Sequence, residues 1–379
     1  FFQADFVDML KLRASYGIGG NIGRNTAPYL IASYYDSSLV DGMAGSVNTP
    51  PNKDIRWEKT TTVNVGVDFA LFRHRLSGTI EYYNKYSVDL LAAINGSPTQ
   101  GFGYTTLMTN NGKMVNRGVE ITLSGEIIRQ KDFSWNASLL YAFNRNKVKH
   151  ISVQPSLWDS RISMPTSYPM VGKPLYGIYA YKWAGLNENG DPQVYDAENN
   201  VTSGPARDYH ALVYCGTTVP IHNASLTNVL RYKGFEFSAM LILDAGHKLR
   251  SSNIPSINMS NGRITSTAKG IVDRWTQPGD VTDVPRLLFS NDTENFNTHR
   301  TELYRYSDLF VYDASNIRLS NISLAYRVPA HWCKKISLSG ARLQFNVENV
   351  ATFAFDSKAN YDLGGKVKPN YVWGLYLNF

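Results

Sequence analysis

Residues 371–379, at the end of the chain, read Tyr-Val-Trp-Gly-Leu-Tyr-Leu-Asn-Phe and alternate between two kinds of side chain. The odd positions carry Tyr, Trp, Leu, Leu and Phe, whereas the even positions carry Val, Gly, Tyr and Asn. A period of two residues is typical of a β-strand, because successive side chains point to opposite faces of a sheet. The segment therefore predicts a strand with one strongly apolar face.

The same alternation recurs upstream. In residues 63–71, Val, Val, Val, Phe and Leu are separated by Asn, Gly, Asp and Ala. Counting such segments predicts about ten strands, at residues 10–17, 61–72, 75–84, 117–128, 133–144, 224–232, 235–244, 316–328, 337–349 and 371–379. The phase of the alternation slips near Ser320-Asn321 and again after Leu338 at Gly340, so both places are predicted to be β-bulges.

The connections between these strands alternate in length. Short ones lie at residues 72–75, 129–132, 233–234 and 329–335, and long ones at about 18–60, 85–116, 145–223, 245–315 and 350–370. Strands of about 9–11 residues with short turns at one end and long loops at the other are typical of an antiparallel transmembrane β-barrel. A soluble sandwich or propeller also alternates, but loops of roughly 70 residues are unusual in compact domains.

Composition excludes several classes of protein. The 379 residues are 18% charged and 13% aromatic, and the longest apolar runs are too short for a transmembrane helix. The net charge of +7 comes from scattered basic residues, so nucleic-acid binding is not indicated. The two cysteines, Cys215 and Cys333, form no disulfide framework or CxxC pair, and the barrel topology predicts that the membrane separates them.

The topology also predicts an orientation. If the long loops are extracellular, the last strand runs toward the periplasm and ends there. Phe379, an aromatic in the apolar phase of that strand, is then the terminal signal that the barrel assembly machinery recognises. The predicted location is the bacterial outer membrane, in contact with its lipid.

Several motifs occur in a fixed order along the chain. They are residues 10–17 (LKLRASYG), 55–60 (IRWEKT), 75–84 (RLSGTIEYYN), 116–120 (NRGVE), 181–186 (YKWAGL) with 189–192 (NGDP), 273–286 (DRWTQPGDVTDVPR), 313–324 (DASNIRLSNISL) and the terminal strand. In this succession the chain resembles the C-terminal portion of the SusC/RagA family of TonB-dependent outer-membrane transporters of Bacteroidetes.

The resemblance implies a barrel of about 22 strands around a plug, of which residues 1–379 are the C-terminal part. The plug, the TonB-binding segment and the first strands would lie outside this sequence. It also implies import of nutrient oligomers, glycan or oligopeptide, with a SusD-like surface lipoprotein as lid and TonB as the energy source. A siderophore or other TonB-dependent receptor and an adhesin-type barrel remain alternatives. No enzyme motif, cofactor motif or metal-ligand spacing is found in the sequence.

Three sets of residues are candidates for function. The polar phase of the strands, predicted to face the lumen, carries Asn64, Asp68, Glu81, Glu120, Glu126, Asn136, Gln344 and Glu348. The third long loop carries aromatic rings suited to stacking on sugars or gripping peptides or a partner, namely Trp158, Tyr168, Tyr176, Tyr179, Tyr181, Trp183, Tyr195 and Tyr209. The strand ends carry the predicted interfacial aromatics Tyr82, Trp135, Tyr141, Tyr232 and Trp373.

For the first two sets a structural role is an alternative. The polar residues also keep the inner wall hydrated and hold the plug, and the rings also pack the loops together. Residues 187–191 (Asn-Glu-Asn-Gly-Asp) are similar to a calcium loop but lack its spacing and its bidentate Glu, so a turn is predicted there.

Overall fold

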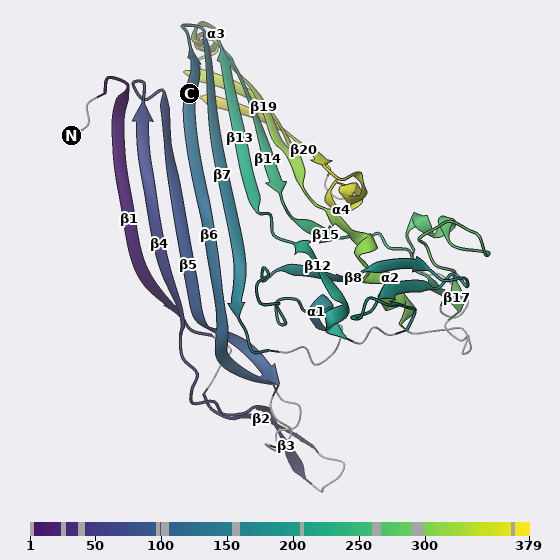
Figure 1. Ribbon diagram of the computed structural model, residues 1–379. Helices are drawn as coiled ribbons and strands as arrows, with labels where there is room; N and C mark the ends of the chain where they lie inside the picture. Colours follow the sequence, from purple (N-terminus) through teal and green to yellow (C-terminus); the bar gives the residue numbers. More distant parts are fainter. Residues whose placement is uncertain are drawn as a thin grey trace.

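A single curved antiparallel sheet dominates the computed structural model (Figure 1). The structure describes residues 4–23, 28–36, 42–95, 99, 106–153, 160–204, 208–259, 267–289, 299–364 and 368–379. The ten strands of the sheet are, in spatial order, β1 (Val7–Asn21), β4 (Glu58–Leu71), β5 (Leu76–Asn95), β6 (Thr106–Arg129), β7 (Phe133–His150), β13 (His222–Tyr232), β14 (Phe235–Ala245), β19 (Asn316–Arg327), β20 (Gly340–Ala354) and β21 (Asn370–Asn378). These are the ten strands that the alternation predicts.

Two strands are much longer than predicted. The segment expected as a loop at residues 85–116 continues β5 to Asn95 and begins β6 at Thr106, and the two extensions stay paired, for example Ala92 with Thr109. Beyond the membrane both faces of a hairpin meet water, so the sequence there has no need to alternate. The period that reveals a strand inside lipid is therefore lost where the same strand leaves it.

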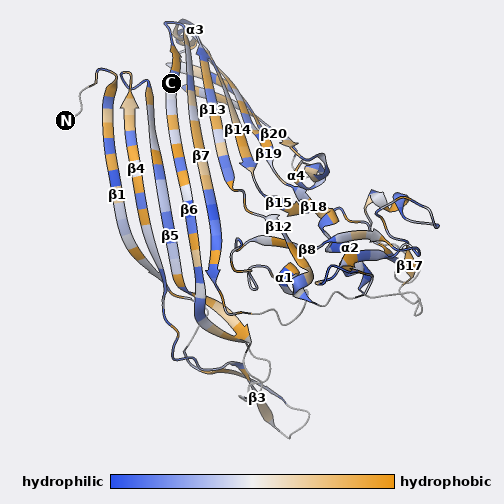
Figure 2. Cartoon of the chain, viewed as in Figure 1, coloured by the Kyte–Doolittle hydropathy of each residue, from blue (hydrophilic) through white to orange (hydrophobic). Residues whose placement is uncertain are grey.

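The strand register aligns the apolar positions into continuous rows across the sheet. One row joins Leu12, Val67, Ile80, Ile121, Tyr141, Ala224, Leu243, Ile317 and Phe353. A second row joins Leu10, Phe69, Gly78, Leu123, Leu139, Leu226, Leu241, Leu319 and Ala351. The alternation of hydropathy along the strands is visible in Figure 2.

Toward the short turns the apolar face becomes aromatic. Trp135, Leu230, Phe237, Leu324, Phe345 and Trp373 form one row, and the Phe345 and Trp373 rings lie 4.2 Å apart. From Ile317 to Tyr326 on β19 the apolar face runs about 25–30 Å along the strand at 3.2–3.4 Å per residue. At the tilt of about 35–45° found in outer-membrane barrels it spans about 18–25 Å of height, comparable with their apolar band of about 25 Å. The described residues leave this face uncovered, since Val65 is 49% and Leu324 47% exposed.

One predicted bulge is confirmed and the other is wrong. On β14, Leu241 pairs with Leu319 and Met240 pairs with Asn321, so Ser320 is an extra residue in β19 and moves its apolar phase from odd to even positions. By contrast, β20 begins at Gly340 and pairs with β21 in unbroken register from there. The phase slip at Gly340 arises because Leu338, 8% exposed, belongs to the preceding connection rather than to the strand.

That connection contains helix α3 (Ala330–Lys335) and holds the buried Cys333. The other short connections are tight turns, and residues 72–74 and Lys233 adopt positive φ there. Both termini of the described chain lie at the short-turn end of the sheet (Figure 1). No helix among the described residues is long and apolar enough to cross a membrane.

The long connections contain further secondary structure at the opposite end of the sheet. The first carries the hairpin β2 (Ile31–Asp36) and β3 (Met43–Thr49), which projects away from the sheet (Figure 1). The loops before β13 and before β19 build a loop subdomain from α1 (Ser160–Ser163), β8 (Gly177–Tyr181), β9 (Trp183–Leu186), β10 (Pro192–Tyr195), β11 (Val201–Thr202), η2 (Tyr209–Ala211), β12 (Leu212–Thr217), β15 (Lys248–Arg250), β16 (Asn258–Met259), η3 (Lys269–Asp273), β17 (Leu288–Phe289), α2 (Arg300–Arg305), η4 (Asp308–Phe310) and β18 (Val311–Asp313). The last carries η5 (Ser357–Ala359) and α4 (Asn360–Gly364).

A charge on the apolar face tests which surface meets lipid. Leu123→Arg places a guanidinium in the middle of the Leu-rich row and is expected to lower the free energy of unfolding by about 2–4 kcal/mol near the bilayer midplane. The matched variant Thr122→Arg puts the same group on the opposite face, one residue away, and is expected to change stability little. Chemical unfolding of the full-length barrel in lipid measures both, and the reverse ranking would reverse the assignment of the two faces.

Candidate functional site

The second face of the sheet is mainly polar, with a few apolar residues such as Leu140 and Ile242. One row on it joins Gly66, Glu81, Glu120, Ala142, Asn223, Asp244 and Asn316. The register places all eight of the predicted polar residues on this face, and they are Asn64, Asp68, Glu81, Glu120, Glu126, Asn136, Gln344 and Glu348. The strands therefore assemble a continuous polar wall from residues that lie as much as 284 positions apart in the chain, counting from Asn64 to Glu348 (348 − 64).

One arginine joins three strands of this wall. The Arg13 guanidinium donates from Nε to Asp68 Oδ2 at 2.7 Å and from Nη2 to Asp68 Oδ1 at 2.9 Å, and it also contacts Glu81. Thr79 Oγ1 donates to the same Asp68 carboxylate at 3.0 Å. Arg13 thus bridges the carboxylates of β4 and β5, and Lys11 stands opposite Asp68 on the same face, so charged groups of both signs line this part of the wall.

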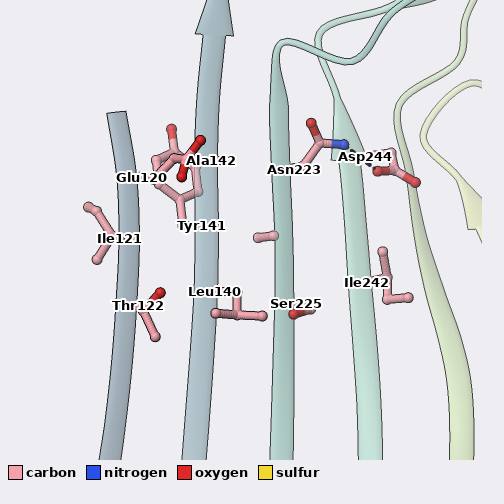
Figure 3. A pocket seen from close by; sticks show the side chains of 11 residues that line it. Glu120, Ile121, Thr122, Leu140, Tyr141, Ala142, Asn223, Ser225, Ile242 and Asp244 are labelled. Carbon is pink, nitrogen blue, oxygen red and sulfur yellow. Dashed lines mark hydrogen bonds between the residues drawn. The ribbon is translucent and has the colours of Figure 1, made fainter. Parts of the chain in front are cut away.

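Farther along the wall lies a shallow hollow of about 350 Å³ (Figure 3). Its polar lining includes Glu120, Asn223 and Asp244, and Asn223 Nδ2 donates to Asp244 Oδ1 at 2.7 Å. Arg318 Nη2 approaches the other Asp244 oxygen at 3.7 Å. Glu120 makes no ion pair with any residue that the structure describes, so its carboxylate is left to accept hydrogen bonds from hydroxyl or amide groups of a ligand or of another protein segment.

Arg13, Asn223, Asp244 and Arg318 were not identified from sequence. The polar phase of β14 reads Glu236, Ser238, Met240, Ile242 and Asp244. Two apolar residues in that phase blur the contrast between the faces. The pairing with β13 shows that Asp244 lies on the polar face, because Asp244 stands directly opposite Asn223.

The aromatic rings predicted to meet a ligand divide into buried and accessible groups. Tyr179 is 1% and Tyr181 0% exposed, and both pack in a core with Val194, Leu212 and Leu303. Burial also raises the pKa of the Tyr179 hydroxyl. For these two rings the structural role holds: they stabilise the loop subdomain and present no surface to a ligand.

The other rings of that set occupy intermediate or exposed positions. Trp183 packs against this core and donates from Nε1 to Asp283 Oδ1 at 3.0 Å. Tyr168 and Tyr195 are half-buried, and the Lys182 ammonium lies 4.6 Å from the Tyr195 ring centre. Tyr176 is 50% exposed.

Two rings cannot be assigned to either group. Tyr209 begins η2, but its side chain is not described. Trp158 lies outside the described residues.

Three exposed tyrosines that were absent from the predicted set lie on β2 and just before it. Tyr29 is 76%, Tyr34 71% and Tyr35 53% exposed. Among the described residues β2 and β3 pair only with each other, and an isolated two-stranded hairpin is marginally stable in water. The hairpin thus offers exposed rings on a support that a partner would stabilise.

A buried ionic clasp holds the loop subdomain together. Arg286 donates to both oxygens of Asp191 at 3.1 and 2.7 Å, and Arg300, 1% exposed, donates from Nε to Asp191 Oδ1 at 3.3 Å. Arg300 also donates to the carbonyl oxygens of Ile257 and Arg286. Burial lowers the pKa of the Arg300 guanidinium, and the Asp191 charge opposes that shift.

Residues 187–191, the segment that is similar to a calcium loop, form a turn that presents Asp191 to the two arginines of the clasp. Asn187 Oδ1 accepts from the backbone N–H groups of Asn189 and Asp191 at 2.9 Å each, which closes the predicted turn. Gly190 has a φ of +75°, and a Cβ atom there would meet the Trp275 ring at 2.4 Å. The Asp191 carboxylate is committed to two arginines, so it serves as an anchor of the subdomain.

No cluster of three or more His, Cys, Asp or Glu suited to a metal occurs in the described ranges. Cys215 and Cys333 are free thiols. Burial raises the pKa of the Cys215 thiol to about 11, which leaves it protonated at neutral pH.

Comparison with known proteins agrees with this architecture. The chain matches the family described as TonB dependent receptor-like, beta-barrel, over residues 2–350. It is 26% identical over 392 residues to TonB-dependent receptor P3 of Formosa agariphila, covering 96% of this chain and 37% of that protein. It is 26% identical over 361 residues to TonB-dependent receptor SusC of Bacteroides thetaiotaomicron, covering 90% of this chain and 34% of that protein.

Among solved structures, the fold matches that of the RagAB peptide transporter with a TM-score of 0.75 at 24% identity. That match covers 100% of this chain and 42% of the transporter chain. The chain therefore spans between one third and one half of the length of the relatives it matches.

A sheet with one lipid-facing surface and one polar surface defines an outer-membrane β-barrel protein. The chain belongs to the TonB-dependent receptor-like β-barrel family, and its resemblance to SusC/RagA transporters is confirmed. The family is one of receptors and transporters rather than enzymes.

Removing the Asp191 carboxylate tests the clasp. Asp191→Asn leaves Arg286 and Arg300 without their anion, and breaking one side of a buried ion pair costs about 3–5 kcal/mol. We expect faster hydrogen exchange and earlier proteolytic cleavage within residues 183–195, 286–289 and 299–305 of the full-length protein. Glu188→Gln, which removes an exposed carboxylate from the same turn, is the control. If both variants are equally protected from hydrogen exchange and proteolysis, the Asp191 ion pairs do not hold these segments together.

Proposed function

We propose that this chain is the C-terminal part of an active transporter that imports nutrient oligomers across the outer membrane. The observation that carries the proposal is the continuous polar wall of the ten-stranded sheet, which lies opposite an uncovered apolar face. In a closed barrel that wall lines a water-filled lumen wide enough for an oligomer. Membership of the receptor family supports this reading.

In this proposal, further strands complete the barrel. Among the described residues β1 pairs only with β4, and β21 only with β20. Unpaired backbone groups are costly in lipid, so both edges need partners. The remainder of the protein would supply the plug, the TonB-binding segment and about twelve more strands, which brings the barrel to about 22 strands in total. Arg13, Asp68 and Glu81 are then positioned to hold the plug as well as to keep the wall hydrated.

The proposed orientation puts the loop subdomain and the β2–β3 hairpin outside the cell. The short turns, α3 and the C-terminus face the periplasm. Phe379 is 92% exposed and follows the apolar phase of β21, in keeping with a role as the terminal signal for barrel assembly. Cys215 and Cys333 then lie on opposite sides of the membrane.

The substrate class is proposed as glycan or oligopeptide. The relative with the matching fold is named as a peptide transporter, and the homologue SusC is named as a TonB-dependent receptor. The hollow beside Glu120 and Asp244 offers acceptors for the hydroxyls of a sugar or the amides and cationic groups of a peptide.

The partner proposed for the outer surface is a SusD-like lipoprotein that closes over the barrel. The exposed rings of the β2–β3 hairpin suit such a contact, since aromatic residues dominate the energetics of protein interfaces. TonB would supply energy through the plug.

Blocking the wall tests transport directly. Ser225 lines the hollow, whereas its neighbour Leu226 belongs to the second apolar row and does not line the hollow. In a full-length Cys215→Ser protein, a bulky thiol reagent on Ser225→Cys is expected to slow energised uptake of labelled oligosaccharides or oligopeptides several-fold. The same reagent on Leu226→Cys serves as the control. Uptake that survives both the block and a protonophore would argue against active transport through this lumen.

The lid contact is tested on the hairpin. Replacing the rings in Tyr34→Ser/Tyr35→Ser is expected to reduce co-purification of the lipoprotein encoded beside the transporter. Tyr176→Ser, which removes an exposed ring from the loop subdomain, is the control. Undiminished co-purification with the double variant would place the lid elsewhere.

A further inference from the structure

A basic hollow lies on the apolar face of the sheet, at the end that carries the long loops. It measures about 660 Å³ and is bounded by β6, β7 and the segments around residues 172–174 and 217–221. These segments are held against the edge of β7, because Val148 N–H donates to the Lys173 carbonyl and Asn144 N–H to the Ile221 carbonyl. The hollow is thus part of the barrel wall.

The register places its cations on the outward side. Val119 pairs with Phe143 in the apolar phase, and the next positions in that phase are the pair Arg117 and Arg145. Lys147 and Lys149 continue the same phase of β7. The charges therefore stand directly beyond the last apolar row, on the face turned away from the polar wall.

In the part of the chain that the structure describes, these cations have no acidic partner. Arg117, Arg145, Lys147, Lys149 and Lys173 line the hollow, and its lining contains no Asp or Glu. Arg117 Nε donates to the amide oxygen of Asn84 at 2.9 Å, and the Lys173 ammonium lies 4.8 Å from the Tyr214 ring centre. None of the five forms an ion pair with a carboxylate of the described residues. Such a concentration of one sign of charge attracts anions.

The floor of the hollow is apolar. Tyr82 and Phe143 lie below the cations and lead into the lipid-facing rows, and Val115 adds an apolar side chain beside Lys147. A ligand that fits must therefore carry anionic groups at the membrane surface and a hydrocarbon portion that continues into the bilayer. A free anion would use only the upper half of the site.

We propose that this hollow binds the phosphorylated headgroup of a lipid of the outer leaflet, with the acyl chains lying along the apolar rows. Basic clusters at the membrane surface recognise anionic lipid headgroups in this way. The assignment to the outer leaflet rests on the orientation given under the proposed function. The site faces lipid rather than the lumen, so it is separate from the path of the transported oligomer.

The test uses the full-length protein in nanodiscs that contain phosphorylated lipid A, with bound lipid counted by native mass spectrometry. The variant Arg117→Gln/Arg145→Gln/Lys147→Gln/Lys149→Gln is expected to bind at least about tenfold more weakly. Lys334→Gln/Lys335→Gln removes two exposed cations at the opposite end of the barrel and is the control. Equal binding by both variants would overturn the proposal.

Two further arms separate the sources of phosphate. Lipid A without its phosphates is expected to bind equally to the wild-type protein and to the quadruple variant. Inorganic phosphate is expected to compete only weakly with phosphorylated lipid A for the wild-type protein. Full displacement by millimolar inorganic phosphate would mean that the site holds a free anion and no lipid. These measurements do not depend on transport.

Orientation is checked separately by labelling. In a full-length Cys215→Ser protein, Lys149→Cys is expected to react with a membrane-impermeant maleimide on intact cells. Labelling only after permeabilisation would remove the outer-leaflet assignment. Uptake by the quadruple variant is expected to be unchanged, so failure of the lipid site and failure of the transport proposal give different results.

Discussion

The structure depends on the requirement that every backbone N–H and C=O within lipid be paired inside the protein. Ten strands meet that requirement by pairing side by side, and only the outer edges of β1 and β21 lack a partner in the described chain. Pairing fixes the register, and the register turns a local alternation into continuous apolar and polar surfaces. The bulge at Ser320 shows how strongly this matters: one extra residue restores the apolar phase, so that Leu319 and Ile322 share a face.

Outside the membrane a different principle organises the chain. The loop subdomain builds its own core from Tyr179, Tyr181 and Leu303, and the Asp191 carboxylate joins Arg286 and Arg300 at its edge. Because these loops are held by their own packing, their placement does not require the strand alternation. The strands of the β2–β3 hairpin pair only with each other among the described residues, and Tyr34 and Tyr35 are exposed.

The same physical features limit what sequence can predict. The period of two identified all ten strands of the sheet, because lipid on one side and water on the other enforce alternation. It failed where that contrast ends: the extensions of β5 and β6 looked like a loop, and Leu338 looked like the start of a strand. Aromatic composition drew attention to the third loop but did not separate the buried Tyr179 from the exposed Tyr176.

The sequence by itself determined the strands, their two faces, the alternation of short and long connections and the family resemblance, since all of these are properties of neighbouring residues. The tertiary structure decided which distant residues meet. It brought Arg13 to Asp68 and Glu81, set Asn223 beside Asp244, and gathered Arg117 and Arg145 with Lys173 around one hollow. Those meetings depend on strand register and loop packing, which link positions too far apart for any local period to reveal.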